Sequence, residues 1–410
     1  MPTTNPAVFW RPSSTGPSAA AGPGGPRPGE PGPGEPVGDG QGRTADDTGA
    51  PGGRRWCLGT TLVVAATAAW AAFLLLHVAL TGRWWVWFLV EAVPPVAFAV
   101  VPALLLAVVW WARPVRRRLT PVLVVLLLAG GYLAGVGPGW RGDTRPAGPG
   151  DAEVSIVSWN TDYWEMDDDP EAFYAFLREK DADVYLLQEY LHWEGEGPVL
   201  IDSLARLRAE FPGYEAVVEG ELLTLSRLPV AAVHSREAPA TDNAWYWQGG
   251  KAQRTDLLVG PGRVLSVYNV HFPVPFRVGD NPLTSRFWNF LAKQHDWWTR
   301  EADALRSDLA ANPNTAVVAG DFNSPWLGSL LRLGDGTAAH SPGPGPLPAF
   351  SWPLADYPVP RAWRLDWLFT TGEAAVPEYR FTDSAGFSDH AAQEFTLVVR
   401  DADRPAPDGG

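Results

Sequence analysis

Three long apolar stretches lie between residues 54 and 140. The first runs from Trp56 to Leu80 without a charged residue, the second from Trp84 to Ala112 with only Glu91, and the third from Leu119 to Trp140. About 20 apolar residues allow a helix to cross the hydrocarbon core of a bilayer. We therefore expect residues 54–140 to be a membrane domain of three transmembrane helices. A cleaved signal peptide is not expected, because the first stretch begins beyond residue 50 and two more follow.

Basic residues between the stretches predict the orientation of this domain. Arg54 and Arg55 precede the first stretch, four arginines between Arg113 and Arg118 precede the third, and only Arg83 separates the first from the second. Basic loops stay in the cytoplasm. We therefore expect a multi-pass protein of the cell membrane, with a cytoplasmic N-terminus and an extracytoplasmic C-terminal part after residue 140.

The second stretch contains one acid and three prolines. Glu91 is expected at the membrane interface within reach of water, with a functional intramembrane acid as the alternative. Pro94, Pro95 and Pro102 are expected to bend the helix, which neighbouring helices can tolerate.

Both ends of the chain have a different composition. Residues 1–53 contain 11 Pro and 13 Gly, so they cannot bury enough apolar surface to offset the entropy of ordering. We expect a disordered tail there, with a polyproline ligand as the alternative, and a second short tail at residues 401–410. Cys57 is the single cysteine, which excludes a disulfide framework and a cysteine-rich metal site.

Short β-branched runs alternate with amphipathic helices between residues 151 and 400. Helical periodicity is present at Pro170–Lys180, which begins with proline, and at Ser285–Ala311. The expected strands are Val154–Trp159, Val184–Gln188, Leu222–Leu225, Val264–Val270, Ala316–Ala319, Trp367–Phe369 and Phe395–Val399. Since strands outnumber helices, the pattern predicts a layered α/β sandwich.

The charge of this part argues against a nucleic-acid partner. Residues 151–410 contain 20 Lys and Arg against 39 Asp and Glu, and the whole chain has a net charge of −14. Affinity for nucleic acid comes largely from neutralising phosphates with basic side chains. A nuclease is therefore not expected, although a bound divalent metal would reduce the repulsion locally.

Acids, amides and imidazoles occur at the ends of several expected strands. They are Asn160, Glu189, Asn269, His271, Asp321, Asn323, Asp366, Asp389 and His390. Carboxylate and amide oxygens suit Mg²⁺, or Mn²⁺ or Ca²⁺, and such an ion neutralises a phosphoryl oxygen. A paired Asp and His can activate water. One such residue alone is more often a cap or turn residue, and it is their conjunction that predicts a hydrolytic site.

Seven short motifs make the pattern specific. WNT, LLQE, LSRLPV, YNVHF, GDFNS, RLDWLF and SDH occur in this order between about Glu153 and Val399. In these motifs the chain resembles the endonuclease/exonuclease/phosphatase superfamily, which has the DNase I-like fold. The resemblance implies a four-layered α/β sandwich with two central sheets, and a metal-dependent hydrolase of phosphoric esters or pyrophosphates.

The resemblance also implies which residues hold the metal. Asn160 and Glu189 correspond to metal-holding positions of the family, and Asp389 to a further contact with the metal or with water. Asp162 stands where some members have another acid.

For catalysis, the resemblance implies a second set of residues. Asp321 resembles the water-activating acid and Asn323 the amide that orients the phosphate. His390 resembles the catalytic imidazole, with Asp366 as its carboxylate partner. His271 resembles the histidine that contacts the scissile phosphate or assists the leaving group.

Other polar residues are weaker candidates. Arg227 and Arg254 are candidates for holding substrate phosphate, with salt bridges inside the fold as the alternative, whereas His234 and His295 are expected to be structural. The Trp-rich stretches 241–249 and 286–298 are candidates for binding bases, with lipid or core contacts as the alternative.

Three membrane spans before an outward-facing domain of this kind resemble the teicoplanin-resistance-type membrane phosphatases. That resemblance implies a lipid-linked pyrophosphate, such as undecaprenyl pyrophosphate, as substrate. The leading hypothesis is a membrane-anchored phosphohydrolase that acts outside the cytoplasm on a phosphomonoester or pyrophosphate. A phosphodiesterase (sphingomyelinase-like or an extracellular nuclease) and a catalytically inactive binding module are the alternatives. No protein partner is evident.

Overall fold

The structure is a computed structural model, and the elements described below all belong to one unit, Cys57–Gly410. It describes residues 56–136, 142–166, 168–195, 197–234, 236, 243–247, 249–277, 279–324, 333–343, 349–354 and 360–401. The expected N-terminal tail, all but the first residue of the expected C-terminal tail, and the end of the third apolar stretch lie outside the described residues.

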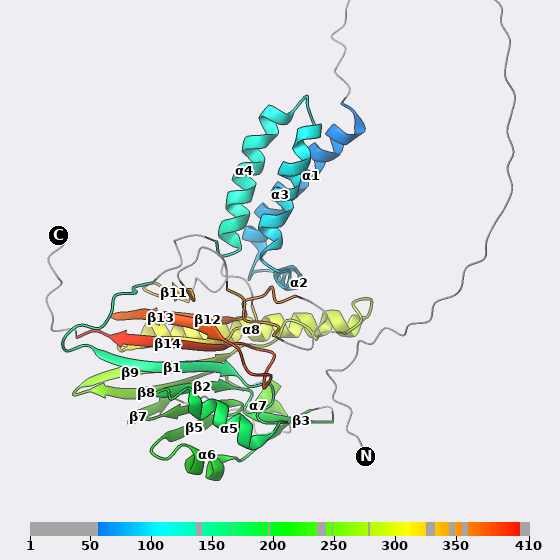
Figure 1. Ribbon diagram of the computed structural model, residues 1–410. Coiled ribbons are helices and arrows are strands. Elements are labelled where there is room, and N and C mark those ends of the chain that lie inside the picture. The colour runs from blue at the N-terminus through cyan, green and yellow to red at the C-terminus, as the bar shows by residue number, and fades with distance from the viewer. Residues whose placement is uncertain are drawn as a thin grey trace, which may run out of the picture. The chain divides into compact units, whose positions relative to one another are not determined.

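The apolar stretches form helices of unequal length. They are α1 (Leu58–Leu80), α3 (Ala97–Val108) with the 3₁₀ turn η1 (Val109–Trp111), and α4 (Arg116–Leu133) (Figure 1). Among the described residues, α1 is the one helix long and apolar enough to cross a membrane. Helix α3 rises about 18 Å at about 1.5 Å per residue, less than the bilayer core. The three-span arrangement therefore stays a prediction.

The second apolar stretch is divided rather than bent. Helix α2 (Trp87–Glu91) ends before Pro94 and Pro95, and α3 begins only at Ala97, because proline lacks the N–H that a helix interior needs. Glu91 is 5% exposed and its Oε1 accepts a hydrogen bond from the backbone N of Gly82 at 2.8 Å. The expectation that Glu91 reaches water is therefore wrong, and its side chain closes the turn between α1 and α2.

Helices α3 and α4 approach each other at a glycine. A Cβ on Gly130 of α4 would lie 1.9 Å from the carbonyl oxygen of Phe98 in α3, so only glycine allows this contact between the two backbones. Small residues serve the same purpose in membrane helix pairs generally. Phe98 also stacks on Phe73 of α1 at a centroid distance of 5.8 Å, which joins the three helices.

Residues after Gly150 form two six-stranded sheets. The order of the first is β13-β14-β1-β2-β6-β5, with β13 (Ala374–Thr382), β14 (Ala392–Val399), β1 (Ala152–Asn160), β2 (Val184–Gln188), β6 (Leu222–Ser226) and β5 (Glu215–Glu219). The order of the second is β11-β12-β10-β9-β8-β7, with β11 (Ala338–His340), β12 (Asp366–Thr371), β10 (Thr315–Asp321), β9 (Arg263–His271), β8 (Ala252–Gly260) and β7 (Val230–His234). β3 (Leu191–Glu194) and β4 (Gly197–Leu200) pair separately.

The two sheets pack face to face and helices cover their outer faces. Ile156 of β1 and Val317 of β10 belong to the apolar layer between the sheets, whereas Val157 faces the other way, as alternation along a strand requires. Helices α5 (Pro170–Glu179) and α6 (Leu204–Glu210) cover the first sheet, and α8 (Ser285–Ala311) covers the second. The expected layered α/β sandwich is confirmed.

Helix α2 packs on the sandwich. Phe88 is 3% exposed and belongs to the apolar core beneath α8, with its ring centroid 6.4 Å from that of Trp298. The indole Nε1 of Trp363, just before β12, donates a hydrogen bond to the carbonyl oxygen of Ala92 at 2.8 Å. Helix α2, which follows α1, is thus part of the core of the C-terminal domain.

Candidate active site

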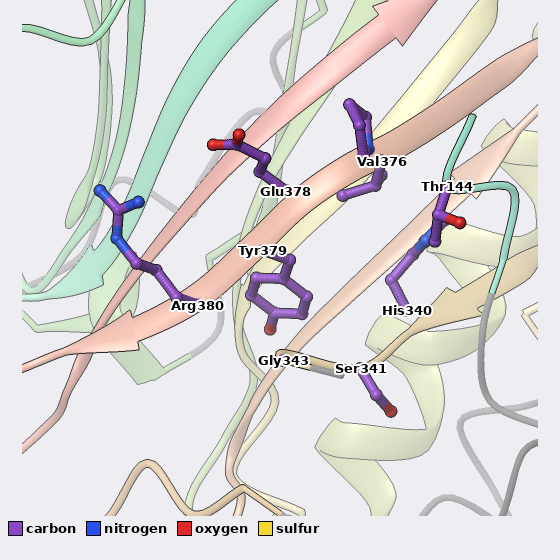
Figure 2. Close-up of a pocket in the computed structure, with 9 residues that line it drawn as sticks. Thr144, His340, Ser341, Gly343, Val376, Glu378, Tyr379 and Arg380 are labelled. Carbon is purple, nitrogen blue, oxygen red and sulfur yellow. The ribbon is translucent and has the colours of Figure 1, made fainter. Parts of the chain in front are cut away.

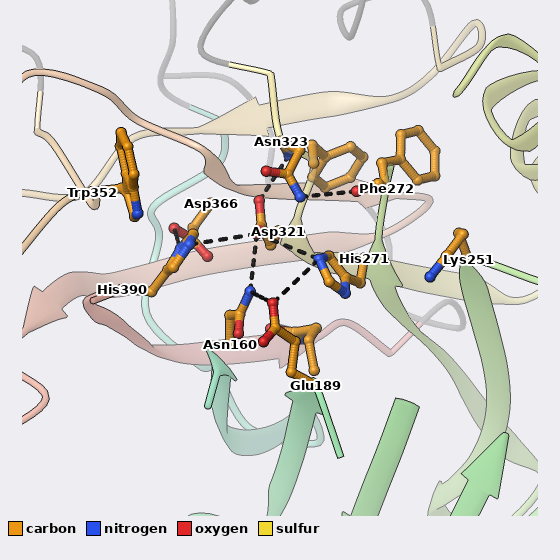
Figure 3. A network of polar contacts seen from close by, with 12 residues as sticks. Asn160, Glu189, Lys251, His271, Phe272, Asp321, Asn323, Trp352, Asp366 and His390 are labelled. Carbon is orange, nitrogen blue, oxygen red and sulfur yellow. Dashed lines mark hydrogen bonds and ion pairs between the residues drawn. The ribbon is translucent and has the colours of Figure 1, made fainter. Parts of the chain in front are cut away.

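Strand ends from both sheets meet at one edge of the sandwich. Asn160 ends β1 beside the end of β2, which Glu189 follows. In the second sheet, Asp321 at the end of β10 is paired with His271 of β9 on one side and Asp366 of β12 on the other. Figure 3 shows these side chains pointing toward one another. The expected convergence of the strand ends is therefore present.

Asp321 lies at the centre of this group. Its Oδ2 accepts a hydrogen bond from Asn160 Nδ2 at 3.1 Å and lies 3.6 Å from Nε2 of His390 and 3.8 Å from Nε2 of His271. The side chain is 1% exposed, and burial raises its pKa although the two imidazoles act in the opposite direction. A buried carboxylate between two imidazoles is well placed to accept a proton.

His390 is held by Asp366. Its Nδ1 lies 2.9 Å from Oδ2 of Asp366, which has no exposed surface. Burial alone would lower the pKa of His390, but the carboxylates of Asp366 and Asp321 outweigh it and raise the pKa well above its usual value. Because Nδ1 is engaged, Nε2 is the nitrogen that faces Asp321.

His271 is held by a carboxylate that the sequence reasoning missed. Its Nδ1 lies 3.0 Å from Oε2 of Glu221, and the Nζ of Lys251 pairs with the other oxygen of Glu221. Burial alone would raise the pKa of Glu221, but His271 and Lys251 outweigh it and lower the pKa to about 2. Burial would likewise lower the pKa of His271, and Glu221 instead raises it.

A sequence signal for Glu221 does exist. The residue lies directly before β6, and β6 runs antiparallel to β2. The start of β6 therefore lies at the same edge as the end of β2 and Glu189. In a mixed sheet the residue before an antiparallel strand reaches the same edge as the residue after its neighbour, so the position of Glu221 before the apolar run Leu222–Leu225 is the signal.

Glu189 presents one oxygen to the protein and leaves the other without a partner. Its Oε1 accepts a hydrogen bond from Asn160 Nδ2 at 3.0 Å, while Oε2 is buried without a hydrogen-bond partner among the described residues. Its backbone has φ of 61°, a left-handed conformation that is uncommon outside glycine. Burial raises the pKa of its carboxyl group.

Asp321 and Asn323 are joined by a turn rather than by extended backbone. The backbone N of Asn323 donates a hydrogen bond to Oδ1 of Asp321 at 2.7 Å, and φ of Asn323 is 47°. An Asp-initiated turn therefore follows β10. Gly320 has φ of 148°, and a Cβ there would lie 1.9 Å from the carbonyl oxygen of Val270, so the GDFN motif needs its glycine.

Two more carboxylates lie at the entrance of the site. Oδ2 of Asp389 accepts a hydrogen bond from the indole of Trp352 at 2.7 Å, and its Oδ1 lies 3.9 Å from His390 Nε2. Loss of solvent and the negative charges of Asp389 and Glu189 raise the pKa of Asp162. Acids that repel one another in this way favour a bound cation.

Asp162 belongs to an unusual turn. Asp162, Tyr163, Trp164 and Glu165 all have φ between 36° and 69°, so four consecutive residues are left-handed without a glycine. Such residues each cost about 1–2 kcal/mol. Trp164 has no exposed surface and lies edge-on to Tyr190 at 4.9 Å, which offsets this cost through burial.

The donor set fits a hard divalent cation. Glu189 offers a buried oxygen without a partner, Asp389 and Asp162 add carboxylates, and Asn160 has an amide oxygen. Ligand atoms of Asp321, Asp366 and His390 also lie within 4.8 Å of one another. Since His390 and Asp366 are already joined by a hydrogen bond, that second group is better suited to proton transfer than to holding an ion.

The two candidate arginines lie in ion pairs of the fold. Arg227 pairs with Asp181 and Asp183, and Arg254 pairs with Asp256. The salt-bridge alternative is therefore confirmed for both.

The Trp-rich stretches contribute to an aromatic cluster beside Lys251. The Nζ of Lys251 lies 4.2 Å from the ring centroid of Tyr246 and 5.0 Å from that of Trp297, and Trp247 lies 6.4 Å from Trp297. These rings surround a buried cation, so cation–π attraction helps to compensate its charge.

A cavity of about 600 Å³ lies apart from the strand-end residues (Figure 2). It is bordered by β11 and β13, and its lining includes Thr144, His340, Tyr379 and Arg380. Asn160, Glu189, His271, Asp321, Asp366 and His390 are not among the residues that line it. The chemistry therefore belongs to the edge of the sandwich and not to this cavity.

Comparison with known proteins gives the family. Residues 157–390 match the sequence profile of the Endonuclease/Exonuclease/phosphatase family, and no curated protein matches the chain. Similar solved structures include family proteins from Leptotrichia buccalis (15% identity, 59% of this chain and 98% of that one, TM-score 0.41) and Bacteroides vulgatus (15%, 60% and 99%, 0.42). A mannosyl-6-phosphatase from Bacteroides thetaiotaomicron is also similar (12%, 60% and 99%, 0.41). Because the profile covers more than half of the chain, this protein belongs to the Endonuclease/Exonuclease/phosphatase family.

Proposed function

We propose that this protein is a membrane-anchored, divalent-metal-dependent phosphohydrolase that acts outside the cytoplasm. Its substrate is a phosphomonoester or pyrophosphate, including lipid-linked pyrophosphates. The observation that carries the proposal is the position of Asp321, whose Oδ2 lies within 4 Å of nitrogens from Asn160, His271 and His390.

Glu189, Asn160 and Asp389 would hold the metal, which we take to be Mg²⁺ (or Mn²⁺ or Ca²⁺). When bound, the ion neutralises charge on a phosphoryl oxygen. The orphaned Oε2 of Glu189 supports this assignment, since oxygen donors suit hard cations.

Asp321 and His390 would act on the attacking water. Asp321 accepts a proton from water at Oδ2, and Asp366 fixes His390 so that its Nε2 stabilises the negative charge beside it. Asn323 would orient the phosphate through its amide, whose Nδ2 is positioned by the carbonyl oxygen of Phe272 at 2.9 Å.

His271 would contact the scissile phosphate or assist the leaving group. Glu221 is a positioning residue, because it fixes the His271 ring through Nδ1 and leaves Nε2 toward Glu189 and Asp321. Lys251 keeps Glu221 ionised.

Two observations support the sidedness. Helix α2 follows the end of α1, where Arg83 is the single basic residue before the second apolar stretch. This helix packs on the sandwich through Phe88. The opposite ends of α3 and α4 carry Arg113 and Arg116–Arg118, which favour the cytoplasm. A catalytic domain that shares a core with α2 would then lie on the outer side.

The test is hydrolysis by the full-length protein in detergent with three substrates, each with and without a chelator. A polyprenyl pyrophosphate, a phospholipid and DNA distinguish a phosphatase from a phosphodiesterase. Release of inorganic phosphate that needs metal and is lost in Asp321→Asn and His390→Ala supports the proposal, with the exposed Glu179→Gln as matched control. Metal-dependent cleavage of DNA or phospholipid without phosphate release would establish the phosphodiesterase alternative, and no hydrolysis of any substrate would favour the inactive binding module.

A further inference from the structure

The segment from Pro273 to Trp288 connects the active site to α8 and exposes large apolar side chains. It begins after Phe272, whose carbonyl oxygen accepts a hydrogen bond from Asn323 at 2.9 Å. Leu283 is 92% exposed and Val274 is 38% exposed. One exposed leucine is ordinary on a protein surface, whereas exposed apolar side chains that lie together mark a contact with a membrane or another protein.

This segment adjoins the end of the first membrane hairpin. The rings of Trp85 and Trp288 meet edge-on at 6.2 Å, and the Trp288 indole Nε1 donates a hydrogen bond to the carbonyl oxygen of Pro282 at 2.9 Å. Trp85, Phe276 and Trp288 are all partly buried at the border of the same apolar core. Trp84, the neighbour of Trp85, is 45% exposed.

The charge of the segment also differs from that of its domain. Residues 272–288 contain two arginines and one acid, Asp280, whereas residues 151–410 have about twice as many acids as bases. Arg277 lies over the rings of Trp247 and Phe290 at 5.4 and 4.9 Å. Tryptophan, leucine and arginine together are typical of surfaces that lie in the headgroup region of a membrane.

We propose that Trp84, Trp85, Val274, Phe276, Leu283 and Trp288 form one rim surface that contacts the bilayer at the boundary between headgroups and acyl chains. The inference rests on the proposed function in so far as it requires the chain to be anchored in a membrane. Its occupant is lipid, because the rim surface continues from the end of α1, the helix able to cross a membrane, and is bordered by arginines that attract anionic headgroups.

The rim surface bears on the substrate of the proposed reaction. The segment that carries Leu283 starts two residues after His271, so the bilayer contact and the imidazole belong to one continuous stretch of chain. The site then receives phosphate groups in the plane of the headgroups, which selects amphiphilic phosphates over freely soluble ones.

The experiment uses a fluorescent label at single cysteines in the full-length protein. Cys57 is the one native cysteine, so Cys57→Ser removes the background. Leu283→Cys tests the rim surface, Leu75→Cys in α1 (73% exposed) reports membrane insertion, and Leu258→Cys in β8 (40% exposed) is the matched apolar control. An environment-sensitive fluorophore on each is measured in vesicles of phosphatidylcholine and phosphatidylglycerol, with and without lipids that carry a nitroxide quencher near the top of the acyl chain.

We expect a blue shift and quenching by the nitroxide lipid at positions 75 and 283, and neither at position 258. Quenching at 75 without quenching at 283 would overturn the rim surface and leave the anchoring intact. Quenching at neither position would refute the anchoring itself. A blue shift at 283 that nitroxide lipids do not quench and that grows with protein density would assign the surface to a second copy of the chain, and would also overturn the inference.

Discussion

Nδ1 of His390 lies 2.9 Å from Oδ2 of Asp366, a carboxylate with no exposed surface. Asp366 begins β12 in the second sheet, whereas His390 precedes β14 in the first. This hydrogen bond fixes the imidazole and raises its pKa. Removing the carboxylate should therefore change how activity depends on pH as well as its magnitude.

Asp366→Asn is expected to lower kcat by about 10²–10⁴-fold, the range typical of a disturbed acid–base group. Because Asp366 raises the pKa of His390, the pH above which the imidazolium loses its proton should move down. The measurement is kcat/KM against pH for the wild type and the variant. An unchanged alkaline limb would contradict the role of Asp366.

The contributions of Lys251 and Glu221 to the free energy of unfolding should depend on each other. Lys251→Met leaves the buried Glu221 with only His271 opposite its charge, and breaking a buried ion pair costs about 3–5 kcal/mol. Glu221→Gln with Lys251→Met should recover most of that loss. Thermal unfolding of the four proteins gives the coupling. A loss in the double variant equal to the sum of the two single losses would show that the pair does not matter for stability.

His340 should make stability fall as the solution is acidified. Burial lowers its pKa from an ordinary value of about 6.5 to about 4, so the unfolded chain binds the proton first as pH falls. Stability from this group is complete above pH 6.5 and is lost between pH 6.5 and pH 4, by at most about 1.4 kcal/mol per pH unit. His340→Gln should flatten the melting temperature across this window. Parallel curves for the two proteins would contradict the assignment.

Metal binding should be visible without turnover. Mg²⁺ at about one hundred times its Kd should stabilise the wild type by about 2.7 kcal/mol, because the ion compensates the carboxylates around Glu189. In Glu189→Gln the rise in melting temperature should disappear, while in the exposed control Glu179→Gln it should persist. A shift that survives in Glu189→Gln would place the ion elsewhere.

Phe88 should support the C-terminal domain although it lies between the apolar helices α1 and α3. Phe88→Ala removes a 3% exposed ring from the core beneath α8, and such changes cost about 3–5 kcal/mol. Val93→Ala, at a 38% exposed residue nearby, is the control. Unfolding followed by near-ultraviolet circular dichroism measures the loss. An unaltered melting temperature for Phe88→Ala would mean that α2 does not share the core.

The strands with continuous apolar runs could be predicted from the sequence, and all seven are present. Strand β8 could not, because Gln253, Arg254, Thr255 and Asp256 are buried in it. Gln253 and Asp256 are satisfied by side chains from other strands, through the Gln253–Thr224 hydrogen bond and the Asp256–Ser266 hydrogen bond, each at 2.6 Å. Hydrophobic periodicity carries no trace of such partners.

The residues of the candidate site likewise divide into those that the sequence predicts and those that depend on tertiary structure. Asp321, Asp366 and His390 could be placed together because each belongs to a short motif beside an expected strand. Glu221 was missed because the direction of β6 in the sheet is a property of the tertiary structure. The exposure of Glu91 was predicted wrongly because its partner, the backbone N of Gly82, becomes available only when α1 ends.

The shape of the entrance to the site depends on the left-handed turn at Asp162–Glu165. A side chain in the interior holds this turn, and the residues that face the site do not. The turn is unfavourable by itself and is held by Trp164, which contacts Phe173 at 5.1 Å inside the domain. A related chain with a smaller residue at this position would let the turn rewind to the right-handed form and move Asp162 away from Asp389. Substrate preference in such relatives can then diverge through substitutions in the interior, with every side chain around the phosphate unchanged.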